Sequence, residues 1–288
     1  MRRICWAAGL WVVCILAGCV CAEEQKTDDT KKTEAWKRKF NTGVSLTQSS
    51  YSNWAGGGEN SVAWTVRFDG EIGKICRDLE WLVTSLMTFG QLKAQKATPK
   101  TTIDKIDVDG TVTWELGPHI NPYVGGGLLT QFSKGYDYKA EPAAAQSKFW
   151  DPAYLSQSLG ARIKAKEVMN SQLGVALKHT FTSEFTKYSD DTKTDKVEKY
   201  KLETGIQSTT KVNAKLVDNI KVLSKLELFS SFESIRLVDM RWDTLFTASL
   251  NKYIVLTLNI QINYDRDVVD KTQIKEVAGL GITYNLFD

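Results

Sequence analysis

The most regular pattern along the chain is an alternation of apolar and polar side chains. In residues 254–264, every second position is apolar or aromatic: Ile254, Leu256, Leu258, Ile260, Ile262 and Tyr264. The positions between them are polar, with the exception of Val255. Because successive side chains of a β-strand point to opposite faces, this pattern predicts a strand with one apolar and one polar face. Residues 59–72, 105–116 and 200–216 follow the same rule.

Twelve such runs can be counted. They cover residues 40–49, 61–72, 79–92, 103–116, 123–132, 153–166, 172–186, 198–216, 220–232, 240–250, 253–264 and 274–287. Most reach or exceed the roughly 9–11 residues that a tilted strand needs to cross a bilayer. Strands of ordinary globular proteins average only about 5–6 residues. The lengths therefore favour membrane-crossing strands over a soluble sandwich.

The connections between these runs alternate in length. When the connections are numbered from the first run, the even-numbered ones are short: 73–78, 117–122, 167–171, 217–219 and 251–252. The odd ones are mostly longer, at 50–60, 93–102, 133–152, 187–197, 233–239 and 265–273. Outer-membrane barrels have short periplasmic turns and longer external loops. We therefore predict an all-β fold, a closed antiparallel up-and-down transmembrane β-barrel of about 12 strands.

The polar faces of these strands are expected to line the interior of the barrel. A sheet within hydrocarbon must close, because an open edge would leave its backbone groups without hydrogen bonds. Charged side chains are tolerated inside if they pair with one another or meet water. The charges predicted to face the lumen are Arg67, Asp69, Asp107, Asp109, Lys178, Glu184, Arg241 and Asp243. Their mixed signs indicate paired charges rather than a strongly ion-selective channel.

The first residues have the pattern of an export signal. Arg2 and Arg3 precede a continuous apolar or small run, and Val20-Cys21-Ala22 suits signal peptidase. We expect a signal peptide at 1–22, a flexible periplasmic segment at 23–39 and an outer-membrane β-barrel domain at 40–288. Leu16-Ala17-Gly18-Cys19 also fits a lipobox, so lipidation at Cys19 competes with cleavage near Ala22.

The composition argues against several classes of function. The chain holds 37 Lys+Arg against 34 Asp+Glu, which gives no basic field for nucleic acid. Four of the 5 cysteines lie in the predicted leader, leaving Cys76 alone. With only 2 histidines, we expect no metal site and no cofactor. A mean hydropathy of -0.27 suits a barrel, whose polar interior offsets its apolar surface.

A glycine-rich segment follows the first predicted strand. Residues 48–61 read QSSYSNWAGGGENS, and include Asn53, Trp54, Gly57, Gly58, Glu59 and Asn60. This segment resembles the signature of the bacterial outer-membrane β-barrel family catalogued as domain of unknown function 3078 (DUF3078). The resemblance extends over roughly 40–288 and implies an outer-membrane barrel without established activity. The segment itself is either an external binding loop that contacts the lumen or a ligand, or a tightly structured turn.

We therefore expect a protein of the Gram-negative outer membrane that is not an enzyme and acts as a narrow pore, transporter or envelope scaffold. Outer-membrane lipid, periplasmic chaperones and the barrel-assembly machinery are its expected partners; the oligomeric state is open. One alternative is a lipid-hydrolysing barrel, because His179 lies on the apolar face of its strand. Another is a lipoprotein anchored at Cys19 that carries a soluble β domain.

Overall fold

The computed structural model describes residues 36–51, 59–95, 97–138, 140–165, 168–191, 194–265 and 269–287. The predicted signal peptide, Cys19 and residues 52–58 of the glycine-rich segment lie outside these residues. Within them, no helix is both long enough and apolar enough to cross a membrane.

The described chain forms one closed barrel and one small hairpin. The barrel strands are β1 (Trp36–Ser49), β2 (Ser61–Cys76), β3 (Leu79–Ala94), β4 (Lys100–Trp114), β5 (Ile120–Thr130), β8 (Ala153–Ala165), β9 (Met169–Phe181), β10 (Tyr200–Val217), β11 (Ile220–Ser231), β12 (Val238–Ser249), β13 (Ile254–Asp265) and β14 (Val269–Phe287). The hairpin pairs β6 (Gly135–Asp137) with β7 (Ala144–Ser147). Two single-turn 3-10 helices complete the structure: η1 (Thr186–Tyr188) and η2 (Phe232–Ser234).

The predicted fold class is confirmed. Each barrel strand pairs with its neighbours in antiparallel order, and β1 closes the sheet against β14. All twelve predicted runs correspond to barrel strands. The hairpin β6–β7 lies within the longest connection and was not predicted. The first strand begins at Trp36, so residues 36–39 belong to the barrel rather than to a flexible segment.

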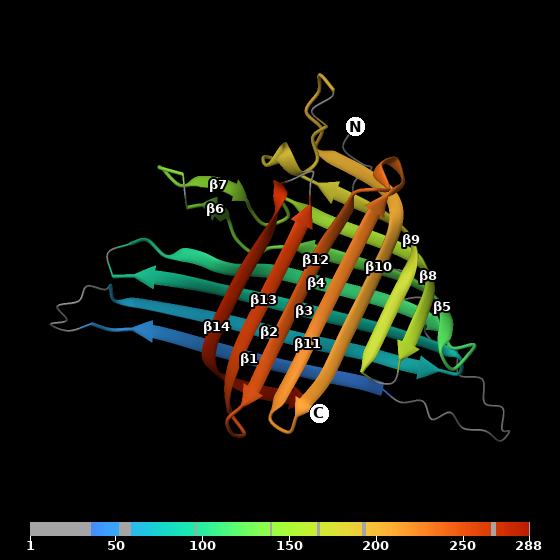
Figure 1. The fold of residues 1–288 in the computed structure, drawn as a ribbon, viewed down its shortest axis with the longest axis horizontal. Helices are drawn as coiled ribbons and strands as arrows, with labels where there is room; N and C mark the ends of the chain where they lie inside the picture. The colour runs from blue at the N-terminus through green and yellow to red at the C-terminus, as the bar shows by residue number, and fades with distance from the viewer. Residues whose placement is uncertain are drawn as a thin grey trace.

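The strands are tilted, so those on one side of the barrel cross those on the other side obliquely. Figure 1 shows β1–β4 running behind β11–β14 at a steep angle. The sheet turns from one side to the other through β5, β8 and β9, where inward positions carry glycines such as Gly160 and Gly174. A Cβ atom on Gly160 would lie 2.1 Å from the carbonyl oxygen of Leu173. Only glycine allows the backbones to approach so closely at this bend.

The two ends of the barrel differ less than the sequence predicted. Short turns join β2 to β3, β4 to β5, β8 to β9, β10 to β11 and β12 to β13 at one end. The opposite end carries the long connections 131–152 and 182–199, with the hairpin β6–β7. The predicted long loop 265–273 is instead a connection of residues 266–268, because β14 begins at Val269. We call the end with the five short turns the short-turn end, and the opposite end the loop end.

Candidate functional site: the charged interior

A belt of ion pairs crosses the middle of the barrel. Lys105 on β4 places its Nζ 3.1 Å from Asp243 Oδ2 on β12. Lys225 on β11 places its Nζ 3.0 Å from Asp107 Oδ1 and 2.7 Å from Asp109 Oδ2, both on β4. Since β4 is not adjacent to β11 or β12 in the sheet, these side chains meet across the lumen.

Three further contacts belong to this central belt. Lys211 on β10 lies 2.8 Å from Asp109, and Glu227 bridges Lys225 at 2.9 Å and Arg241 at 3.2 Å. The central belt thus contains equal numbers of cations and anions: Lys105, Lys211, Lys225 and Arg241 with Asp107, Asp109, Glu227 and Asp243. Charges taken out of water in this way are stable only when each has a partner. The belt therefore crosses the lumen, and its own charges balance.

A second cluster lies nearer the short-turn end and centres on Glu80, whose side chain is 1% exposed. Its carboxylate accepts hydrogen bonds from Lys37 at 2.8 Å, Arg162 at 2.8 Å and Lys164 at 2.9 Å. These three cations come from β1 and β8, so the cluster connects strands that are not adjacent to β3. We call it the Glu80 cluster.

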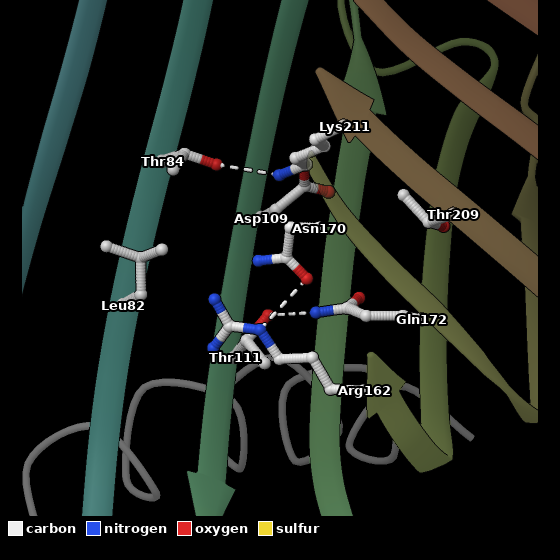
Figure 2. Close-up of a pocket in the computed structure, with 9 residues that line it drawn as sticks. All are labelled: Leu82, Thr84, Asp109, Thr111, Arg162, Asn170, Gln172, Thr209 and Lys211. Atoms are coloured by element: carbon white, nitrogen blue, oxygen red, sulfur yellow. Dashed lines mark hydrogen bonds and ion pairs between the residues drawn. The ribbon is translucent and has the colours of Figure 1, made fainter. Parts of the chain in front are cut away.

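Little space remains between the central belt and the Glu80 cluster. Figure 2 shows the cavity there, which is about 20 Å³ and has Lys211 at one side and Arg162 at the other. Lys211 donates to Thr84 at 3.1 Å, and Arg162 donates to Asn170 at 2.9 Å. A space of this size holds about one water molecule. The interior on this side is therefore packed with polar side chains.

Larger spaces lie on either side of the belt. A cavity of about 380 Å³ reaches from the inner ends of β1, β2 and β11–β14 to the short-turn end. At the loop end, a cavity of about 280 Å³ is lined by barrel residues, including Tyr154, Lys178 and Arg241, and by loop residues Lys187 and Tyr188. Burial lowers the pKa of Lys187 and raises the pKa of Tyr188.

The loops over the second cavity are tied together by Asp151, which is 1% exposed. Its carboxylate accepts hydrogen bonds from the backbone N–H groups of Ser183 at 3.0 Å and Glu184 at 2.7 Å. This carboxylate satisfies buried donors of a different loop, a task that backbone pairing performs within strands. The connection between β5 and β8 is thereby joined to the one between β9 and β10.

The structure places most of the predicted inward charges in pairs. Asp107, Asp109, Arg241 and Asp243 belong to the central belt. The remaining pairs are Arg67 with Asp69 at 2.8 Å, and Lys178 with Asp239 at 2.7 Å. Glu184 differs, because β9 ends at Phe181; it is instead a loop residue, 65% exposed, whose carboxylate contacts Lys148.

The predicted loop motif is only partly described. Asn53, Trp54, Gly57 and Gly58 lie outside the described residues, and Glu59 is exposed. The Oδ1 atom of Asn60 accepts a hydrogen bond from the backbone N–H of Tyr51 at 2.5 Å. This contact brings together the two described ends of the loop.

His179 lies on the outer face of β9, as its parity indicates. Its Nδ1 lies 2.8 Å from the hydroxyl of Tyr200, and its ring stacks on Phe181. Its Nε2 has no hydrogen-bond partner among the described residues. A hydrolase that uses this histidine as a base would need a nucleophile within hydrogen-bond reach. In the described part of the chain, no serine hydroxyl bonds to it, and no cluster of three or more His, Cys, Asp or Glu could hold a metal ion.

Two important interior residues were missed by the sequence reasoning. Glu80 is the only charged residue in the first half of its run, between Leu79 and Trp81, and strand parity could have placed it inside. Lys105 shares the polar parity of Asp107 and Asp109, so strand parity also places it inside. Its partner Asp243 is 138 residues away, so no local signal joins them.

These features define a closed antiparallel barrel with an apolar outer face and an ion-paired interior. The chain matches the model of the family described as "Protein of unknown function (DUF3078)" over residues 46–136, which confirms the resemblance for that part of the sequence. A search of curated proteins found no match.

Solved structures of other barrels are similar to this chain at low identity. The translocator domain of autotransporter NalP from Neisseria meningitidis is 8% identical, with 96% of this chain and 94% of that chain covered and a TM-score of 0.36. The COG4313 outer membrane channel from Pseudomonas putida F1 is 9% identical, with 90% and 99% covered and a TM-score of 0.38. OprB from Pseudomonas putida is 8% identical, with 87% and 94% covered and a TM-score of 0.35.

Proposed function

We propose that this protein is an integral barrel of the bacterial outer membrane and that it forms a narrow pore constricted by the central belt. The distribution of side chains supports the membrane location. On β13, Leu256 and Leu258 are 46% and 37% exposed, whereas the inward Val255 and Asn259 are 4% and 7% exposed. Apolar side chains outside and polar ones inside reverse the order of a soluble protein and match a lipid-facing barrel.

Strand length and closure support the same location. The shortest barrel strand has 11 residues and the longest has 19, which is enough to cross a bilayer at a tilt. Closure through β1 and β14 leaves no barrel strand with a free edge in hydrocarbon. Outer-membrane lipid is therefore the proposed environment, and export with the help of periplasmic chaperones and the assembly machinery is the proposed route.

The observation that carries the pore proposal is the central belt between two cavities. Spaces of about 380 Å³ and 280 Å³ lie at opposite ends, and the ion-paired side chains lie between them. Ion pairs can exchange partners with water and permeating ions, whereas a packed apolar core cannot. We therefore expect a small unit conductance that depends on how the belt fills the lumen.

Planar bilayers test this proposal. Purified protein is expected to give discrete, small conductance steps, and the double variant Lys225→Ala/Asp107→Ala is expected to enlarge them severalfold. Removing both partners avoids leaving one buried charge without its counterpart. The matched control is Lys215→Ala/Asp218→Ala, which removes an exposed ion pair of 2.9 Å at a turn and should leave the steps unchanged. Silence from both the wild type and the belt variant would reject the pore and favour an envelope scaffold.

A further inference from the structure

The cavity at the loop end is lined by a row of inward side chains on three neighbouring strands. Arg241 on β12 lies directly opposite Asn263 on β13, and Asn263 lies directly opposite Gln273 on β14. All three line the space of about 280 Å³, which we call the loop-end cavity. Directly opposed residues of antiparallel strands have Cβ atoms about 4.5–5.5 Å apart. The guanidinium and the two amides therefore share one patch of the wall, which we call the amide row.

The amide row is open to the cavity. Asn263 and Gln273 are exposed, and neither side chain forms a hydrogen bond with another described residue. Arg241 keeps 37% of its side chain exposed, although its Nε lies 3.2 Å from Glu227 Oε2. A primary amide carries two N–H donors and a carbonyl acceptor, so the row presents both kinds of group to a ligand.

The charges around the amide row balance one another. Arg241 is paired with Glu227, and the Nζ of Lys178 lies 2.7 Å from Asp239. The ionisable groups of the lining, tyrosines apart, are three cations and three carboxylates: Lys178, Lys187, Arg241, Glu227, Asp239 and Asp265. The lining therefore has no excess of one charge with which to attract an ion, and its free polar groups are neutral amides.

Aromatic rings stand beside the amide row. The guanidinium carbon of Arg241 lies 5.9 Å from the ring centre of Tyr154 on β8. Tyr188 on η1 also lines the cavity, as does Phe229 on β11. Neither tyrosine hydroxyl forms a hydrogen bond with another described residue. Each tyrosine thus combines an apolar ring with a free polar tip.

Loop residues bound the cavity opposite the barrel wall. Lys187 donates a hydrogen bond to Gln146 on β7 at 3.1 Å, and both line the cavity together with Tyr188. This contact links the connection 131–152 to the connection 182–199 above the amide row. The volume of about 280 Å³ is close to the lower end of ligand pockets, roughly 300–1,000 Å³. It therefore suits one small ligand.

From this arrangement we propose that the loop-end cavity binds a small neutral saccharide. A sugar hydroxyl both donates and accepts hydrogen bonds, which matches the amides of Asn263 and Gln273. The C–H face of a sugar ring packs against an aromatic ring such as that of Tyr188. An apolar ligand would instead cover the amides without giving them partners. The inference goes beyond the proposed pore, because binding requires the cavity and not conduction.

The test is saturation-transfer NMR with the full-length exported protein in micelles of an amine-oxide detergent, which has no sugar headgroup. The probe is methyl glucoside, and protein-free micelles give the background. We expect saturation transfer to the probe, with an affinity that changes less than about twofold when salt is raised about tenfold, because no net charge is involved. No transfer above background would overturn the proposal. Glucuronate is the charged counterpart; if it bound more tightly than methyl glucoside and salt weakened it, the cavity would be an anion site instead.

Variants assign the binding to the amide row. Asn263→Leu and Gln273→Met keep similar side-chain volumes without the amide, and each is expected to weaken binding of methyl glucoside about fivefold. Asn213→Leu is the matched control, because Asn213 is an exposed amide that lines the 380 Å³ cavity. It should leave the affinity unchanged.

Tyr188 separates the contribution of the ring from that of the hydroxyl. Tyr188→Phe is expected to keep most of the affinity, whereas Tyr188→Ala should lose at least about fivefold. If Asn213→Leu weakened binding as much as Asn263→Leu, the site would not be the amide row and the assignment would fail. Heat-modifiable gel mobility, which reports the folded barrel, should stay the same in all variants.

Discussion

Asp151 illustrates how a single buried carboxylate organises the loop end. It replaces the backbone partners that Ser183 and Glu184 lose when β9 ends at Phe181. Such a contact is stronger than one between neutral groups, because the acceptor is ionised. The loop above the 280 Å³ cavity therefore depends on one side chain from a different connection.

Removal of that carboxylate should loosen the loop and leave the barrel intact. Asp151→Ala leaves backbone donors without a partner, which costs about 1–3 kcal/mol. We expect trypsin to cut the connection 182–199 faster in the variant, at Lys187, Lys196 or Lys199, with unchanged heat-modifiable mobility. Asp151→Asn keeps one acceptor and should give an intermediate rate. Equal cleavage rates in all three proteins would contradict the role of Asp151.

The sequence predicted which face of its strand a side chain lies on, but not which residue it pairs with. Parity placed Asp107, Asp109 and Asp243 on the polar face of their strands, where the structure has them paired inside the barrel. The partners could not be derived in the same way. The ion pair between Lys105 and Asp243 depends on the distance across the barrel and on the stagger of its strands. Neither quantity can be derived from a local sequence pattern.

At the scale of strands, period two was sufficient to locate all the barrel elements, because a strand with lipid on one side must alternate strictly. The ends were harder to predict. β1 begins at Trp36, within a charged stretch where Trp36 and Phe40 are too few to establish an apolar alternation. The hairpin β6–β7 was missed because its strands have only 3 and 4 residues.

The alternation on β13 gives a direct test of which face meets lipid. Leu258→Arg places a charge on the outer face and should cost roughly 2–4 kcal/mol in a bilayer. Thr257→Arg is the matched variant, one position away on the same strand, with its side chain in the 380 Å³ cavity. It should cost much less, because the cavity has room for the longer side chain and offers it polar neighbours such as Thr247 and Asn213. Urea titration of the folded fraction in liposomes measures both; equal losses would reject the assignment of faces.

The glycines at the bend give a second test at this scale. Gly160→Ala forces a Cβ to within 2.1 Å of the Leu173 carbonyl oxygen and 2.5 Å of Gly174 Cα, so the paired backbones must separate. We expect a loss of about 1–3 kcal/mol or more, as for other overpacked sites. Gly110→Ala is the control, since its Cβ would meet nothing within 4 Å. A Gly160→Ala barrel as stable as Gly110→Ala would mean that the bend is looser than described.

For the whole molecule, closure is the property on which the other features depend. The seam joins β1 near one end of the chain to β14 near the other, with Val44 opposite Ile282. Both side chains are on the outer face, 51% and 62% exposed. Without this seam the ion pairs across the lumen would have no fixed separation, and both strands would have an open edge of unpaired backbone groups.

A disulfide across the seam tests closure. In a Cys76→Ser background, Val44→Cys/Ile282→Cys should cross-link on mild oxidation, because directly opposed antiparallel residues lie within the Cα separation that a disulfide allows. The link would join residues 44 and 282 and change the gel mobility of the boiled, non-reduced chain. Val44→Cys/Thr283→Cys is the control: Thr283 lies opposite Gly43 and between the outward Ile282 and Tyr284, so its side chain points away from the outer face and should not cross-link. Cross-linking in the control but not in the first variant would shift the register by one residue, which would turn Leu280 and Ile282 of β14 into the lumen and remove the physical basis for the proposed membrane barrel.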